Sequence, residues 1–177
     1  MGQWFKRLAL LLSFGSPGGE ALGAAAPPQV GDAAPEFELS LQDGSRFALN
    51  SRREVGWTVL YFYPKADTPG CTKQACAYRD GIQRIRSQKA EVYGISTDEV
   101  AQLAAFHQKY HLSFNLLSDP QGLVTEAYGV KMPVLSMAKR WTFLIDSKGV
   151  IRDINTEVDP ALDASWVVDR LVALQAH

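Results

Sequence analysis

The stretch of sequence that decides the fold spans residues 57–76 and reads WTVLYFYPKADTPGCTKQAC. Its first seven residues, Trp57 to Tyr63, are apolar, aromatic or β-branched without alternation, which is typical of a strand buried on both faces. Pro64 ends this strand, and from Pro69 onward apolar residues recur at helical spacing. A buried strand that leads through a short loop into a helix predicts an α/β fold.

The flanking segments continue this alternation of strands and helices. Residues 37–49 alternate in polarity around Asp43-Gly44, which predicts a β-hairpin. The same criteria predict strands at 92–96 and 114–117, a helix over 100–110 capped by Asp98, a short helix opened by Asp119-Pro120 and closed by Gly129, a hairpin of 141–145 and 150–154, and a last helix from Asp159-Pro160 to about Leu174. We therefore expect a central sheet with helices on both faces, and ligand sites beyond the carboxyl ends of its strands.

The composition limits the classes of function. The chain has 177 residues, of which 46% are hydrophobic, and a formal net charge of −1. These values suit one compact domain, which we place at residues 30–177, and they do not favour a nucleic-acid partner. Two cysteines in a chain of this length are too few for a disulfide scaffold, so they are bystanders, ligands or reagents.

Residues 1–29 differ from the rest of the chain. Lys6 and Arg7 precede the apolar run Leu8 to Phe14, and a Gly/Ala-rich stretch ends at Ala26. This order predicts a signal peptide and export to the periplasm, and the alternative is a disordered extension on a cytoplasmic protein. A helix of seven residues is about 10 Å long, too short to span a bilayer.

Cys71 has the surroundings of a reactive thiol. It lies in the first turn of the helix predicted after the buried strand, where backbone N–H groups lack intrahelical partners and the helix dipole is positive. Both effects favour the thiolate, which is the nucleophilic form. Thr68 lies one turn upstream, and its hydroxyl can donate to an incoming oxygen.

Cys76 follows five residues later on the same predicted helix. That spacing turns it about 140° away from Cys71 and separates the two Cα atoms by about 8.6 Å. A disulfide needs Cα atoms within about 7 Å, so either the two never pair or the helix unwinds when they do. Cys71 shares the core-facing stripe of Ala75 and Tyr78, whereas Cys76 is predicted to face solvent.

The segment resembles the active site of a peroxiredoxin, whose signature here is Pro64, Thr68 and Cys71. The extended motif, Thr68-Pro69-Gly70-Cys71-Thr72 with a second cysteine at Cys76, resembles that of the peroxiredoxin Q, or bacterioferritin comigratory protein, subgroup. Arg140, two residues before Thr-Phe-Leu-Ile-Asp, also fits. The resemblance covers residues 30–174 and is far more specific than a short motif alone.

The resemblance implies a thioredoxin-like fold with a central mixed sheet and an N-terminal hairpin. It also implies an antioxidant thiol peroxidase that reduces hydrogen peroxide and organic hydroperoxides without a metal or other cofactor. Cys71 would be the peroxidatic residue and Cys76 the resolving one, with Thr68 and Arg140 stabilising the leaving oxygen and Pro64 shielding the sulfenic acid. The Cys71–Cys76 disulfide of this atypical two-cysteine cycle would be reduced by thioredoxin or a similar dithiol protein, and the enzyme would be a monomer or at most a weak dimer.

Two other classes of function compete. Cys71 and Cys76, with His107 and His111, partly imitate the spacing of a Cys₂His₂ zinc module, although a whole predicted strand separates the two pairs. A thiol–disulfide exchanger acting on proteins is the other class, but such enzymes favour Cys-x-x-Cys, which this chain lacks.

Overall fold

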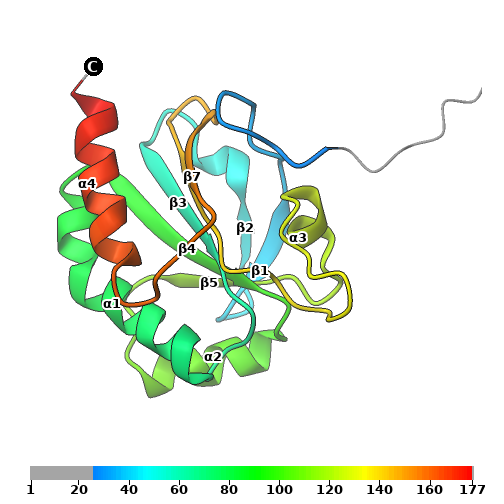
Figure 1. The fold of residues 1–177 in the computed structure, drawn as a ribbon. Coiled ribbons are helices and arrows are strands. Elements are labelled where there is room, and N and C mark those ends of the chain that lie inside the picture. The colour runs from blue at the N-terminus through cyan, green and yellow to red at the C-terminus, as the bar shows by residue number, and fades with distance from the viewer. Residues whose placement is uncertain (1–25, 177) are drawn as a thin grey trace, which may run out of the picture.

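The computed structural model describes residues 26–176, which form a seven-stranded sheet between layers of helix and loop (Figure 1). The elements in chain order are β1 (Glu38–Leu41), β2 (Arg46–Ala48), the 3₁₀ helix η1 (Leu49–Arg52), β3 (Trp57–Phe62), α1 (Pro69–Arg86), β4 (Ala90–Ser96), α2 (Val100–Lys109), β5 (Asn115–Ser118), α3 (Leu123–Ala127), β6 (Thr142–Ile145), β7 (Ile151–Asn155) and α4 (Asp163–Gln175). Every predicted strand and helix is present, which confirms the α/β class.

The sheet is mixed, in the order β2-β1-β5-β4-β3-β6-β7. β3, β4 and β5 run parallel at its centre, while β1, β2, β6 and β7 pair antiparallel towards the edges. The central strands are buried on both faces, and their carboxyl ends share one edge of the sheet. The loop between β3 and α1, which carries Thr68, starts from that edge, where α/β sheets place their ligand sites.

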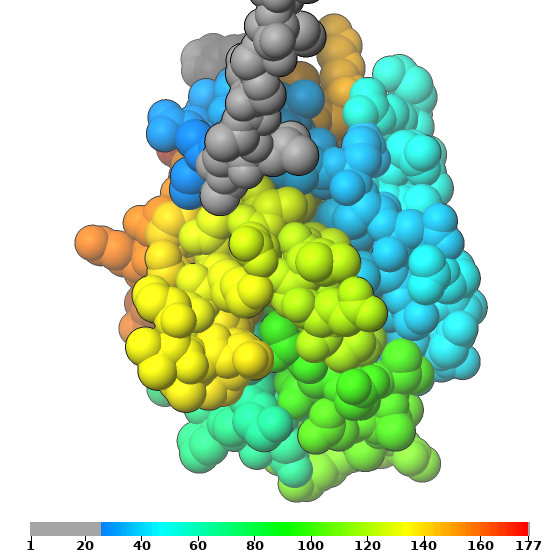
Figure 2. Space-filling view, turned by 90° about the vertical axis from the view of Figure 1, so that its right-hand side faces the viewer, coloured from blue at the N-terminus to red at the C-terminus, as the bar shows by residue number. Residues whose placement is uncertain are grey.

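The two faces of the sheet are covered differently. One face packs against α1, α2 and α4, and the core there includes Val59, Tyr78, Phe106 and Leu171. The other face packs against α3, the β1–β2 hairpin and the segments around it, which lie towards the viewer in Figure 2. Figure 1 shows α1 and α4 side by side on one side of the sheet and the short α3 on the other. Helices therefore cover both faces, as predicted.

A glycine makes room for a tyrosine beneath the site. Tyr61 of β3 pairs with Gly94 of β4, and a Cβ at Gly94 would lie 2.6 Å from the Tyr61 hydroxyl oxygen. The Tyr61 ring stacks on Tyr63 and Tyr78, with centroids 5.4 and 4.7 Å away. The three buried rings thus form an aromatic layer between β3 and α1. Aromatic pairs of this kind add to the free energy gained by burial.

Three expectations about helix starts were wrong. Asp98 does not cap α2; Glu99 is the N-cap residue and forms a capping box with Gln102. The predicted starts at Asp119 and Asp159 come early, because α3 begins at Leu123 and α4 at Asp163. Asp119 still accepts from the Leu123 and Thr125 N–H groups, so it stabilises the start of α3 from outside the helix.

No helix among the described residues is long and apolar enough to cross a membrane. The expected signal peptide over residues 1–29 falls almost entirely outside residues 26–176.

Candidate active site

Cys71 is the third residue of α1 and lies buried at the start of that helix, with 2% of its surface exposed. Thr68 is the N-cap residue and Pro69, which has no N–H to lose, occupies the first helical position. The first intrahelical bond runs from the Thr72 N–H to the Thr68 carbonyl, at 2.8 Å. The Cys71 N–H precedes that bond, so it is oriented along the helix start with no intrahelical acceptor.

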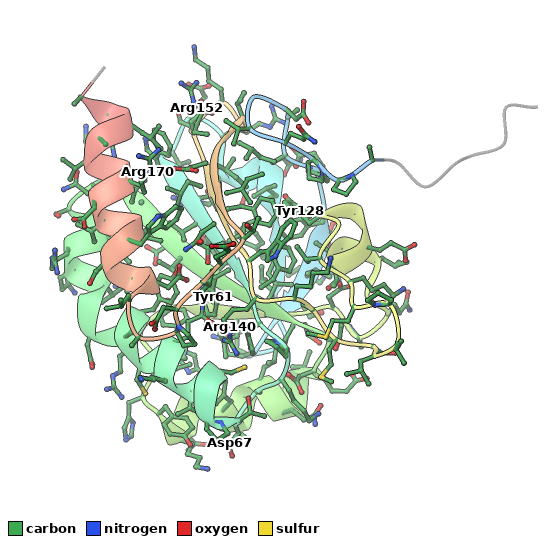
Figure 3. The ribbon with its side chains drawn as sticks, in the orientation of Figure 1. Tyr61, Asp67, Tyr128, Arg140, Arg152 and Arg170 are labelled. Atoms are coloured by element: carbon green, nitrogen blue, oxygen red, sulfur yellow. The ribbon has the colours of Figure 1, made fainter. Side chains whose placement is uncertain are left out.

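Arg140 lies on the sulfur of Cys71. Its Nη2 donates to Cys71 Sγ at 3.3 Å, and its Nη1 donates to Gln74 Oε1 at 2.6 Å. Figure 3 shows Arg140 just below Tyr61, between the sheet and the loop that carries Asp67. Gly70 leaves the space for this approach, because a Cβ there would lie 3.3 Å from Arg140 Nη2. The structure thus brings together two residues that are 69 positions apart.

Beneath Arg140 lies a buried carboxylate, Asp163, at the start of α4. Its Oδ2 accepts from Gln74 Nε2, the Tyr78 hydroxyl and the Thr142 hydroxyl, at 2.8, 2.6 and 2.8 Å. Burial raises the pKa of Asp163, and these hydrogen bonds oppose that rise. Gln74, which is fully buried, connects this carboxylate with the guanidinium that contacts the thiol.

The loop before Cys71 is fixed by a hydrogen bond within itself and by Asp98, which follows β4. Thr68 Oγ1 donates to the Lys65 carbonyl at 2.9 Å, so its hydrogen points back into the loop rather than towards Cys71. Asp98 accepts from the Ala66 N–H at 2.7 Å, so it stabilises this loop and does not cap α2. Pro64 is half-buried between β3 and this loop.

Asp67 holds the same loop to the end of α2. Its backbone has a φ of 59°, in the left-handed region that non-glycine residues seldom adopt. Its carboxylate accepts from Lys109 Nζ at 2.8 and 2.9 Å and from the Tyr110 hydroxyl at 2.7 Å, and these bonds lower the pKa of Asp67. The loop is therefore held in a strained conformation by contacts from outside it.

Cys76 lies one and a half turns further along α1. It is half-buried rather than facing open solvent as predicted, and both cysteines are free thiols. The helix is continuous from Pro69 to Arg86, so the two cysteines lie on different sides of an intact helix. This is the arrangement in which a bond between them requires local unwinding.

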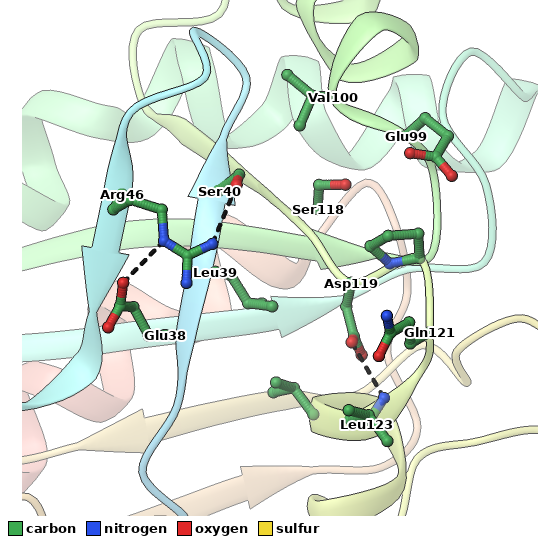
Figure 4. A pocket seen from close by; sticks show the side chains of 12 residues that line it. Glu38, Leu39, Ser40, Arg46, Glu99, Val100, Ser118, Asp119, Gln121 and Leu123 are labelled. Carbon is green, nitrogen blue, oxygen red and sulfur yellow. Dashed lines mark hydrogen bonds and ion pairs between the residues drawn. The ribbon is translucent and has the colours of Figure 1, made fainter.

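The zinc alternative gains no support from the structure. Among residues 26–176, no three His, Cys, Asp or Glu side chains are grouped closely enough to hold a metal ion. The pocket between β1, β5 and α3 is also separate from the thiols, since the described residues that line it include neither cysteine (Figure 4).

Sequence reasoning missed two residues of this constellation. Gln74 could have been found, because it lies three residues after Cys71 and so shares its helix face. Asp163 gives no comparable signal, since an acidic residue in a first helical turn is ordinary. Its partners Gln74 and Tyr78 lie 89 and 85 positions away.

Comparison with known proteins places the chain in a family. Residues 30–154 match the model of the AhpC/TSA family. The chain belongs to the AhpC/TSA family. A putative peroxiredoxin bcp of Coxiella burnetii is 40% identical over 149 residues, covering 81% of this chain and 98% of that protein. The peroxiredoxin Bcp of Escherichia coli is 43% identical over 135 residues, covering 72% and 85%.

Plant relatives and solved structures agree with this assignment. The chloroplastic peroxiredoxin Q of Triticum aestivum is 43% identical over 132 residues, covering 73% of this chain and 60% of that longer protein. The peroxidoxin BcpB of Mycobacterium tuberculosis superposes with a TM-score of 0.77 at 38% identity, over 82% of this chain and 97% of that one. The fold is therefore the thioredoxin-like fold of the peroxiredoxins, as expected.

Membership in this family identifies the reaction that the protein catalyses. It is a thiol peroxidase that reduces peroxides by a cysteine-based mechanism, and recycling by thioredoxin is typical of its relatives. The peroxidase assignment thus prevails over the zinc module and the protein thiol–disulfide exchanger.

Proposed function

We propose that Cys71 is the peroxidatic residue, Cys76 the resolving residue, and the cycle an atypical two-cysteine cycle with an intramolecular disulfide. The observation that carries this proposal is the 3.3 Å contact between Arg140 Nη2 and the sulfur of Cys71. The guanidinium places a positive charge beside this buried sulfur, and the thiolate is the form in which a cysteine attacks. Cys76 has no such contact among the hydrogen bonds of the described residues.

In the first step the Cys71 thiolate attacks the terminal peroxide oxygen and the O–O bond breaks. The sulfur becomes a sulfenic acid, and the leaving oxygen takes up a proton to give water or an alcohol. Negative charge develops on that oxygen, where Arg140 and the Cys71 N–H can stabilise it. The Thr68 hydroxyl contributes after its hydrogen turns from the Lys65 carbonyl towards the substrate. Pro64 covers the sulfenic acid against water.

In the second step the Cys76 thiol attacks the Cys71 sulfur and a water molecule leaves. The first turns of α1 must unwind for this, since an intact helix keeps the Cα atoms about 8.6 Å apart. An external dithiol protein of the thioredoxin type then reduces the disulfide by exchange. Hydrogen peroxide and organic hydroperoxides are both proposed as substrates, and a monomer suffices because both cysteines belong to one helix.

Mass spectrometry of the protein after one equivalent of hydrogen peroxide tests this cycle. We expect the loss of two hydrogens and a peptide pair joined through Cys71 and Cys76. Circular dichroism of the same sample should show less helix than the reduced protein. An oxidised protein joined between two chains, or a sulfenic acid that persists at Cys71 although Cys76 is present, would contradict the resolving role of Cys76.

We propose export to the periplasm on the basis of residues 1–29 alone, with the cytoplasm as the alternative. The matched relatives do not support export, and the segment falls outside residues 26–176 except at its end. The mass of the mature protein, isolated from cell fractions, decides between the two. Cleavage near Ala26 would support export, and full-length protein in the cytosol would exclude it.

A further inference from the structure

Asp163 is a buried carboxylate that the proposed peroxidase cycle does not use. It is 1% exposed, and three donors converge on its Oδ2: Gln74 Nε2, the Tyr78 hydroxyl and the Thr142 hydroxyl. Oδ1 has a weaker contact with Asn155 Nδ2 at 3.4 Å. None of these partners is charged, and no ion pair of the described residues includes Asp163.

An unpaired buried carboxylate costs free energy, which neutral hydrogen bonds offset only in part. A core of apolar side chains could join α1, α4 and β6 without that cost. The placement of the carboxylate is informative, since one of its three donors is also the hydrogen-bond partner of the active-site guanidinium.

The Gln74 amide lies between the Arg140 guanidinium, which can only donate hydrogen bonds, and Asp163 Oδ2, which accepts them. Arg140 has no acceptor, so it requires the amide oxygen Oε1 of Gln74. Asp163 Oδ2 already receives two hydroxyl hydrogens and requires the amide nitrogen Nε2. A flipped amide would set –NH₂ against the guanidinium and oxygen against the carboxylate. The two neighbours therefore impose the same orientation on Gln74.

We propose that Asp163 is a positioning residue of the peroxidase site: it holds the Gln74 amide in the orientation that accepts from Arg140, so that the second guanidinium nitrogen stays on the sulfur of Cys71. The inference rests on the proposed roles of Cys71 and Arg140. Asp163 touches neither, and it acts only through Gln74.

The consequence for catalysis lies in the ordering of Arg140. An arginine side chain has many rotamers, and immobilising it costs entropy that fixed acceptors must offset. With Gln74 fixed, one nitrogen of the guanidinium is bound and the other points at Cys71 before the peroxide arrives. Such preorganisation is what makes an electrostatic contact effective in the transition state.

A double-mutant cycle between Gln74→Glu and Asp163→Asn tests the proposal. Gln74→Glu alone places two carboxylates about one hydrogen bond apart, so we expect a slow first turnover with hydrogen peroxide. Adding Asp163→Asn supplies an amide donor to the new carboxylate, which still accepts from Arg140. The double variant should react with peroxide at least about tenfold faster than Gln74→Glu alone, a coupling within the usual range for residues in one network.

A second cycle uses variants that keep the volume of the core. Asp163→Asn lets the amides at both positions flip, and we expect the first-turnover rate to fall about three- to tenfold, since one positioning contact is weakened. In the Gln74→Met background, Asp163→Asn should have no further effect. Because kcat is set by disulfide reduction when reductant is limiting, only kcat/KM for peroxide should fall, and kcat should stay the same.

Two control variants separate positioning from stability. Asp169→Asn makes the same chemical change at an exposed site on α4 and should alter nothing. Leu171→Ala removes buried apolar volume from α4 without removing a hydrogen bond of Asp163 or Gln74, so it should lower the melting temperature while the rate per titrated thiol stays at the wild-type value.

Additive effects in the first cycle, or an equal effect of Asp163→Asn with glutamine and with methionine at position 74, would overturn the role of Asp163. If Gln74→Glu does not fold, the methionine cycle decides alone. A wild-type protein that does not react with peroxide at Cys71 would instead remove the proposed function, so the two failures are distinguishable.

Discussion

Cys71 and Cys76 belong to one helix and are five residues apart, yet the structure gives them different surroundings. Cys71 is buried at the helix start under Arg140, above the stacked rings of Tyr61 and Tyr63. Cys76 is half-buried in the middle of α1, where every backbone N–H has an intrahelical acceptor. The two thiols therefore differ in burial and in contact with Arg140, and this difference is the basis of the separate roles proposed for them.

The difference arises from groups that the helix itself does not supply. Arg140 comes from the segment before β6, and the loop ahead of Cys71 is held by Asp98 and by the end of α2. Burial also raises the pKa of Tyr61 and Tyr63 far above the usual range, so the floor of the site stays neutral. The sulfur of Cys71 thus lies against the Arg140 guanidinium and near tyrosine hydroxyls that stay neutral.

Replacing each cysteine by serine should give the largest difference between Cys71 and Cys76. Cys71→Ser should abolish peroxide reduction, because a serine hydroxyl is not ionised at neutral pH. Cys76→Ser should keep the wild-type rate of the first turnover and then stop, leaving a sulfenic acid at Cys71. Stopped-flow fluorescence with hydrogen peroxide measures both. Equal first-turnover rates in wild type and Cys71→Ser would end the assignment.

Removing the cation should give the next largest effect. Arg140→Ala is expected to slow the first turnover about 100-fold, which is typical for the loss of one group that stabilises a developing oxyanion. Arg140→Lys should recover little of it, because an ammonium cannot reach Gln74 and Cys71 together in the fork geometry of a guanidinium. Arg152→Ala, on the exposed side of β7, is the control and should leave the rate unchanged.

Loosening the loop should affect the second step and not the first. Lys109→Met removes the ion pair with Asp67, whose strained backbone can then relax and let the start of α1 unwind. We expect disulfide formation to accelerate a few-fold at most, since both partners are exposed and such pairs contribute little. Rapid-quench mass spectrometry follows this step. Lys148→Met is the matched control, and a slower disulfide step would contradict the prediction.

The smallest expected effect concerns pH and Asp163. Its pKa in the folded protein is raised above the ordinary value of 3.8, so the folded state holds the proton more tightly than the unfolded state. Stability from this group is present below the unfolded pKa and is lost as the pH rises towards the folded pKa. Asp163→Asn has no such loss, so its stability relative to wild type should rise with pH across that window. Urea unfolding at several pH values measures the difference, and a constant difference would contradict it.

Local patterns predicted much of the site as well as the fold. The uninterrupted apolar run of β3, the proline after it and the helical stripe that follows are properties of neighbouring residues. They place Cys71 at a helix start and turn Cys76 away from it without any tertiary contact. The errors at Asp98, Asp119 and Asp159 are of one kind, because an acidic residue near a helix start can bond several different backbone groups.

What the sequence by itself determined is the order of strands and helices, the position of Cys71 at the start of α1 and the separation of the two thiols, since all three follow from helical and strand periodicity. Only the tertiary structure decided which donors and acceptors meet at that thiol. Arg140, Gln74 and Asp163 come from three segments up to 89 positions apart. Hydrogen bonds over such separations depend on how the chain packs, and no local periodicity encodes them.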